Sequence, residues 1–241
     1  MNFTRSPLFA IGAMKRVLTL TLLLLAQPAL GAMSLDKIIV YLTDQPNSRD
    51  DIVVSNPDQE TLYLQTEIYR VDNPGMPDEK RVRVVNPKEF KLLVNPARAV
   101  LASGEQKRFR LMSLERDLDR EKVYRVTFKP VVGEIKSDRT ALKILVAYQA
   151  LVFVQPEEGR AQLALEQGEE GWQLTNRGNI NTEVSEVTYC PSRASCRPLD
   201  MAGRIYAGAA LAVDESLQSG GMLKLLARGR ESRRLEIPIP D

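Results

Sequence analysis

The chain has 241 residues, with 33 basic against 31 acidic side chains, so its formal net charge is only +2. This near balance gives no broad positive field for nucleic acid, and any electrostatic function must be local. The absence of His excludes Ser-His-Asp and Cys-His nucleophiles. No glycine-rich phosphate loop is present, so nothing in the sequence favours an enzyme or a bound cofactor.

Residues 1–31 have the pattern of a secretory signal peptide. Two basic residues precede the apolar run 17–26, and small residues follow it. That run is too short to span a bilayer as a mature helix, although a retained membrane anchor is the alternative interpretation. We place cleavage after Gly31, with cleavage after Ala32 as the second choice and Met14 as an alternative start. The exported chain would then have 241 − 31 = 210 residues, with no membrane insertion of the mature part.

Short strands separated by turns dominate the rest of the chain, and this pattern is typical of all-β sandwiches. The strands expected in the first half are 37–42, 51–55, 62–69, 83–85, 91–94, 107–112, 124–128 and 142–156. The one candidate for a helical turn is the charged segment 113–122.

A turn-forming segment at 156–159 predicts a hinge. The strands expected beyond it are 161–166, 171–175, 182–189, 222–226 and 234–239. We therefore predict two sandwiches in series, at 32–155 and 157–241.

Cys190 and Cys196 are the only cysteines of the chain. In an oxidising compartment a short disulfide loop is expected between them, with two free thiols as the alternative. A metal pair is disfavoured because no His and no further Cys can complete a tetrahedral site. Asp117 and Asp119 have ligand-like spacing but lie among basic residues, so we predict no metal site.

The run 142–156 has apolar side chains on both of its faces. One face carries Leu142, Ile144 and Val146, and the other carries Leu145, Ala147, Leu151 and Phe153. A half-buried strand should alternate apolar and polar residues. Either this strand is buried on both sides, or one face is open for a partner chain. We favour the second interpretation for the first set, and the core of the first domain for Leu151 and Phe153.

Five segments resemble, in order and spacing, those of periplasmic pilus-assembly chaperones of the chaperone–usher pathway, the PapD-like superfamily. These segments are 32–37, 93–110, 123–128, 142–156 and 174–179. They are similar to the family's first strand, its proline-bearing strand and the following Arg-containing strand, the strand before its variable loop, its donor strand, and its Leu-Thr-Asn-x-Gly-Asn turn. Tyr124-Arg125 and the cysteine loop look most like the alternate branch of the EcpB or CfaA type.

The resemblance implies two immunoglobulin-like β-sandwich domains in a boomerang arrangement, located in the periplasm. Pilus or fimbrial subunits would bind in the cleft and along the last long strand of the first domain, before delivery to an outer-membrane usher. A pilin subunit lacks one strand, and the chaperone supplies it by β-augmentation. The donor-strand contacts would be Leu142, Ile144 and Val146. The resemblance implies no cofactor.

The expected anchor for the subunit's C-terminal carboxylate departs from the family's best-known branch. That branch uses an Arg and a Lys at positions that Ile39 and Leu151 occupy here, and neither can bind a carboxylate. Nonclassical members carry arginines at places that match Arg110 and Arg125. Guanidinium groups suit a bidentate carboxylate contact, so we predict these two arginines as the anchor. Two solvated surface arginines are the alternative.

A secreted carbohydrate-binding or adhesive β-sandwich module is the second hypothesis for function. Sugar sites usually present exposed aromatic side chains, and this chain has a single Trp, Trp172. We expect Trp172 in a core, which disfavours this hypothesis.

Overall fold

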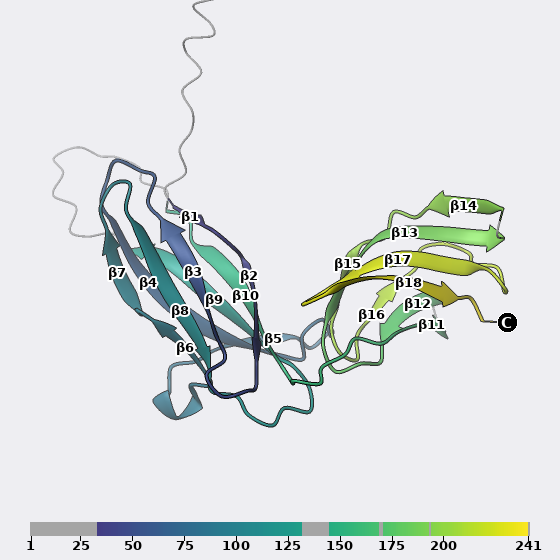
Figure 1. The fold of residues 1–241 in the computed structure, drawn as a ribbon, viewed down its shortest axis with the longest axis horizontal. Helices are drawn as coiled ribbons and strands as arrows, with labels where there is room; N and C mark the ends of the chain where they lie inside the picture. The colour runs from purple at the N-terminus through teal and green to yellow at the C-terminus, as the bar shows by residue number, and fades with distance from the viewer. Residues whose placement is uncertain (1–32, 132–144, 169–170, 193, 241) are drawn as a thin grey trace, which may run out of the picture.

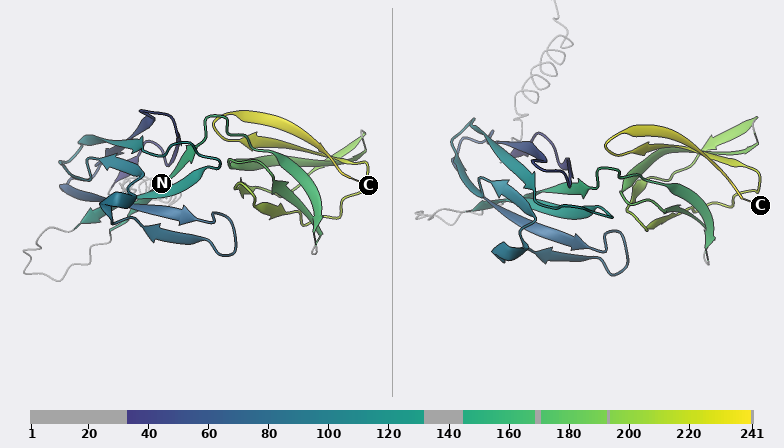
Figure 2. Two further views of the ribbon diagram at one scale, coloured as in Figure 1. Left: turned by 90° about the horizontal axis from the view of Figure 1, so that it is seen from below. Right: turned by 60° about the horizontal axis from the view of Figure 1, so that its bottom comes forward.

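The computed structural model describes residues 33–131, 145–168, 171–192 and 194–240. The fold is all-β, with two sandwiches that lie one after the other along the longest axis of the molecule (Figures 1 and 2). The predicted signal peptide at 1–31 and the predicted contacts Leu142 and Ile144 lie outside the described residues.

The first sandwich has a four-stranded sheet and a six-stranded sheet. The four-stranded sheet contains, in spatial order, β1 (Ser34–Leu35), β3 (Arg49–Ser55), β8 (Gln106–Ser113) and β6 (Leu92–Asn95). The six-stranded sheet contains β2 (Ile39–Thr43), β10 (Tyr148–Gln155), β9 (Lys122–Val131), β4 (Leu62–Asp72) and β5 (Lys80–Arg83), with β7 (Arg98–Leu101) also paired to β4.

Alternating apolar residues of both sheets meet in the first core. Phe109 of β8 meets Phe128 of β9 edge to face, with ring centroids 5.2 Å apart. Both rings are fully buried, as are Ile52 and Val126. Since successive residues of a strand point to opposite faces, the neighbours of these core residues face outward. The sequence alternation therefore decides which side chains the outer faces carry.

The chain changes sheets between its first two strands. Leu35 of β1 pairs with Val54 in the four-stranded sheet, whereas Ile39 of β2 pairs in parallel with Leu151 in the other sheet. The edge of β10 is consequently covered by β2 over only part of its length.

The second sandwich has a three-stranded and a five-stranded sheet. The three-stranded sheet contains β11 (Leu163–Gly168), β12 (Gly171–Asn176) and β16 (Ala210–Ala212). The five-stranded sheet contains β14 (Ser195–Pro198), β13 (Thr182–Ser192), β17 (Met222–Arg228) and β18 (Ser232–Pro238), with β15 (Gly203–Ile205) paired to β13. Its core includes Leu174, Val184 and Leu223, and Trp172 packs against it.

The predicted helical turn at 113–122 is wrong. The segment between β8 and β9 is an irregular connection with Asp117 at a φ of 51°, and the helix of the described part of the chain is a 3₁₀ turn at Pro87–Glu89. Tertiary hydrogen bonds decide the path of the connection. The Leu118 N–H donates to Asp44 Oδ2 at 3.0 Å, and the Glu121 N–H donates to the Asn179 carbonyl of the second domain at 3.0 Å.

The predicted disulfide is confirmed. The Sγ atoms of Cys190, on β13, and Cys196, on β14, are bonded at 2.06 Å. The described residues contain no group of three or more side chains suited to a metal ion. They also contain no helix with the length and apolar character needed to span a membrane.

Candidate functional site

The outer face of the six-stranded sheet combines a basic residue with apolar ones. One row across the strands is Ile39, Leu151, Arg125, Tyr69 and Arg83. This row lies on the side of the sheet opposite the Phe109–Phe128 core, because residues 124, 126 and 128 of β9 point inward.

The end of this face nearest the second domain is closed by an aromatic contact. Phe153 of β10 stacks on Tyr41, with centroids 5.3 Å apart, and lies 6.3 Å from the Tyr206 ring of the second domain. The Arg204 guanidinium lies 5.0 Å from the Phe153 ring centre. Phe153 is therefore buried at the domain junction, and Leu151 is half-buried beside it. Our placement of these two residues in the core of the first domain is wrong, because both point to the outer face.

A buried polar cluster joins the two domains beneath this contact. Glu121 is 5% exposed, and its Oε2 accepts hydrogen bonds from Asn181 Nδ2 at 2.6 Å and Gln155 Nε2 at 3.2 Å. Arg204 donates to Asn181 Oδ1 and pairs with Glu183 at 2.6 Å. Burial raises the pKa of the Glu121 carboxyl, against the opposing effect of the hydrogen bonds from Asn181 and Gln155.

A cleft of about 790 Å³ opens next to this cluster. Its lining includes Arg70, Glu115 and Tyr124 of the first domain and Gly208 of the second. Arg70 pairs with Asp72 at 2.7 Å, so charges of both signs are matched within it. The cleft belongs to the domain junction and its described lining favours no particular ligand by charge.

One edge of β10 is open at the end away from the junction. Pairing with β2 begins at Leu151, whereas pairing with β9 begins at Tyr148. Within the described ranges, residues 148–150 therefore have a neighbouring strand on one side only. Val146, just before the strand, is 52% exposed. An exposed apolar residue beside an unpaired strand edge is a template for another chain.

Arg125 projects from β9 onto the same outer face. Its Nη1 donates to Gln149 Oε1 at 3.1 Å, and its Nε is buried without an acceptor among the described residues. Burial raises the pKa of the Tyr206 phenol, while the positive charges of Arg204 and Arg125 act in the opposite direction. Arg125 therefore faces toward the second domain.

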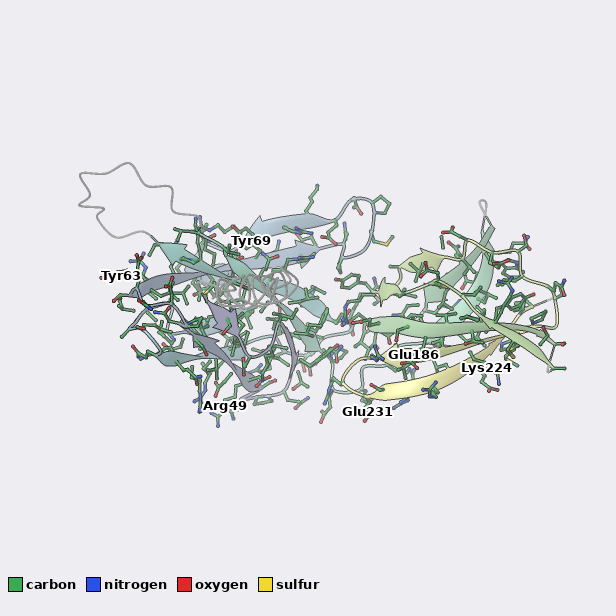
Figure 3. The ribbon with its side chains drawn as sticks, turned by 90° about the horizontal axis from the view of Figure 1, so that it is seen from above. Arg49, Tyr63, Tyr69, Glu186, Lys224 and Glu231 are labelled. Carbon is green, nitrogen blue, oxygen red and sulfur yellow. A yellow bond between two sulfur atoms is a disulfide. The ribbon has the colours of Figure 1, made fainter. Side chains whose placement is uncertain are left out.

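Arg110 lies on the other sheet of the sandwich. Its Nε and Nη2 bind both carboxylate oxygens of Asp51, at 2.9 and 3.2 Å, and this pair lowers the pKa of the Asp51 carboxyl. Figure 3 labels Arg49, which shares the outer face with Asp51, and Tyr69, which shares the outer face with Arg125, on opposite sides of the sandwich. The structure thus does not bring Arg110 and Arg125 together.

Three contributors to this face were missed by sequence reasoning. Gln149 and Thr127 alternate with core residues, and this alternation was a signal that could have placed them beside Arg125. Tyr206 offered no such signal, because its contact depends on how the second domain packs.

The comparisons with known proteins agree with this architecture. Residues 32–160 match the family described as "Pili and flagellar-assembly chaperone, PapD N-terminal domain". A CS1 fimbrial protein of Escherichia coli, which carries the letter B among the CS1 subunits, is 28% identical over 151 residues. That match covers 59% of this chain and 63% of the relative, which is less than two thirds of the relative's length.

Solved structures show the same fold over most of the chain. The Class 5 fimbriae chaperone CfaA is 23% identical, with a TM-score of 0.68, over 87% of this chain and 100% of that one. A chain of the CsuC–CsuE chaperone–tip adhesion subunit complex of Acinetobacter baumannii is 13% identical, with a TM-score of 0.59, over 88% and 100%. At these identities the likeness concerns the fold alone.

Proposed function

This chain belongs to the family of pili and flagellar-assembly chaperones, and from that membership we propose that it binds fimbrial subunits in the periplasm and delivers them to an outer-membrane usher. The family is one of chaperones and not of enzymes. The names of similar proteins, a CS1 fimbrial subunit and a class 5 fimbriae chaperone, favour fimbrial subunits as the partners. We take 32–155 and 157–241 as the two working domains.

The open edge of β10 is the single observation that carries this proposal. Residues 148–150 present unpaired backbone groups, and an incoming strand can satisfy them by β-augmentation. We propose that Leu142, Ile144 and Val146 enter the groove of the bound subunit. Burying three such side chains contributes on the order of 5 kcal/mol before the ordering costs of association.

The carboxylate anchor of the proposed site is Arg125. It lies on the outer face that the second domain borders, and among the described residues no ion pair engages it. Arg110 already binds Asp51 through two hydrogen bonds and lies on the opposite side of the sandwich. We therefore propose Arg125 alone as the contact to the subunit's C-terminus, with Arg110 in a structural role.

The carbohydrate-binding hypothesis has no support from the site. Trp172, its one candidate platform, packs against the core of the second sandwich.

The test is periplasmic co-expression of the full chain with a tagged fimbrial subunit encoded by the same genome, followed by pull-down. Wild type should be recovered with the subunit in equal amounts. Arg125→Ala should lower recovery at least about tenfold, because loss of a charge-assisted contact at an interface typically exceeds 1 kcal/mol.

Arg110→Ala is the matched control, since it removes the same side chain from the opposite sheet. It should leave recovery unchanged. Equal losses in both variants would contradict the assignment of Arg125, and no recovery of any subunit by the wild type would contradict the proposed function.

A further inference from the structure

The guanidinium of Arg125 has one edge held and one edge free. Nη1 donates to Gln149 Oε1 at 3.1 Å. Nε is buried and has no acceptor in the part of the chain that the structure describes. A carboxylate that binds arginine in a bidentate manner takes two parallel N–H groups from one edge. With Nη1 engaged, the remaining edge is the one formed by Nε and Nη2.

Gln149 is itself held in place by its other side-chain atom. Its Nε2 donates to Thr127 Oγ1 at 2.9 Å, which turns Oε1 toward Arg125. Gln149 and Thr127 are direct cross-strand partners, and Arg125 is two residues along β9 from Thr127. The three side chains therefore share the outer face and form a short chain of hydrogen bonds across two strands.

The acid that lies across from Thr127 on this face is already engaged by other groups. Glu67 pairs with Arg83 at 3.1 Å and accepts a hydrogen bond from the Tyr69 hydroxyl at 3.0 Å. It therefore does not fill the free edge of Arg125. A buried donor without an acceptor is rare in folded proteins and indicates a missing partner.

We propose that Gln149 is a positioning residue that fixes the Arg125 guanidinium, so that its Nε–Nη2 edge receives the carboxylate of a bound partner. This inference rests on the proposed function and adds the residue that orients the anchor. The backbone of Gln149 lies in the open part of β10, where β2 does not pair. One residue thus takes part in both strand pairing and carboxylate binding.

The test needs no identified subunit, because acetate serves as the carboxylate probe and acetamide as the neutral control. The Nε–Hε resonance of Arg125 is followed by NMR in the ¹⁵N-labelled exported chain and is identified by its loss in Arg125→Lys. Acetate should shift this resonance with saturation, and acetamide should not.

Gln149→Met keeps the side-chain length but removes the acceptor, so it should weaken the apparent acetate affinity about fivefold. Gln149→Glu should abolish the shift, because its own carboxylate would occupy the guanidinium. Gln65→Met is the matched control, since Gln65 lies on the same face but donates to Glu67. It should titrate as the wild type does.

Each outcome is decisive. Equal acetate affinity in wild type and Gln149→Met overturns the positioning role, and no shift in the wild type overturns the free edge. Either result leaves subunit capture by the open strand edge intact. Conversely, an acetate shift that depends on Gln149, together with absent subunit capture, would support this inference and contradict the proposed function.

Discussion

Glu121 shows how a single buried acid joins two domains. It lies in the connection between β8 and β9, yet its backbone N–H binds the Asn179 carbonyl and its side chain binds Asn181. Among the described residues the carboxylate has amide partners and no directly bound cation, so burial outweighs its hydrogen bonds and raises its pKa.

Because the folded-state pKa of Glu121 lies above the unfolded value, its favourable contribution is complete below about pH 4.3 and is lost as the pH rises through the folded pKa. The Glu121→Gln variant cannot ionise and should lack this decline. Urea unfolding between pH 4 and pH 8 measures the difference in unfolding free energy. The variant should gain stability relative to wild type as the pH rises, and a constant difference would contradict this expectation.

At the scale of elements, β10 has two different halves. From Leu151 onward it is paired on both sides, whereas residues 148–150 pair with β9 alone. The reason is that the chain switches sheets between β1 and β2, so none of the described strands covers this first part of the edge.

Val146→Ser tests the role of this edge. Val146 is 52% exposed, so the substitution should change the unfolding free energy by no more than about 0.5 kcal/mol. It should nevertheless reduce subunit recovery roughly tenfold, since an apolar contact to the groove is lost. Val85→Ser is the control, because Val85 is 68% exposed but lies outside the edge. Equal recovery for both variants would argue against the edge.

The β13–β14 hairpin is closed by a disulfide that is distant from the candidate site. The bond joins residues six apart, and the double substitution of Cys190 and Cys196 by Ala should lower the unfolding free energy by about 2 kcal/mol. Subunit recovery should not change at a temperature where the protein stays folded. Denaturant titration and pull-down measure the two effects, and loss of recovery without loss of stability would assign the hairpin to the site.

At the scale of the whole molecule, the contact of Phe153 with Tyr206 and Arg204 supports the relation between the two sandwiches. It is assembled from residues of separate segments that the sequence does not connect. The outer face of the first domain thereby acquires a wall formed by the second.

Phe153→Ala should lower the unfolding free energy by about 3 kcal/mol and widen the distribution of distances between the domains in small-angle X-ray scattering. Phe109→Ala removes a fully buried ring from the first core and should cause a comparable loss of stability. That control should leave the scattering curve of the folded protein unchanged. Identical curves for wild type and Phe153→Ala would show that other contacts hold the domains.

The sequence alone was sufficient for the all-β class, the series of two sandwiches, most strands and the cysteine pair, because alternation, turn residues and spacing are local signals. It missed short strands such as Arg98–Leu101 and Gly203–Ile205, whose pairing supplies what their composition does not. Alternation also indicated that Arg110 and Arg125 point away from the core. Only the tertiary structure decided that they do so on opposite sheets, because the sheet that a strand joins depends on long-range pairing. The same is true of the Phe153 contact and of the partner of each arginine.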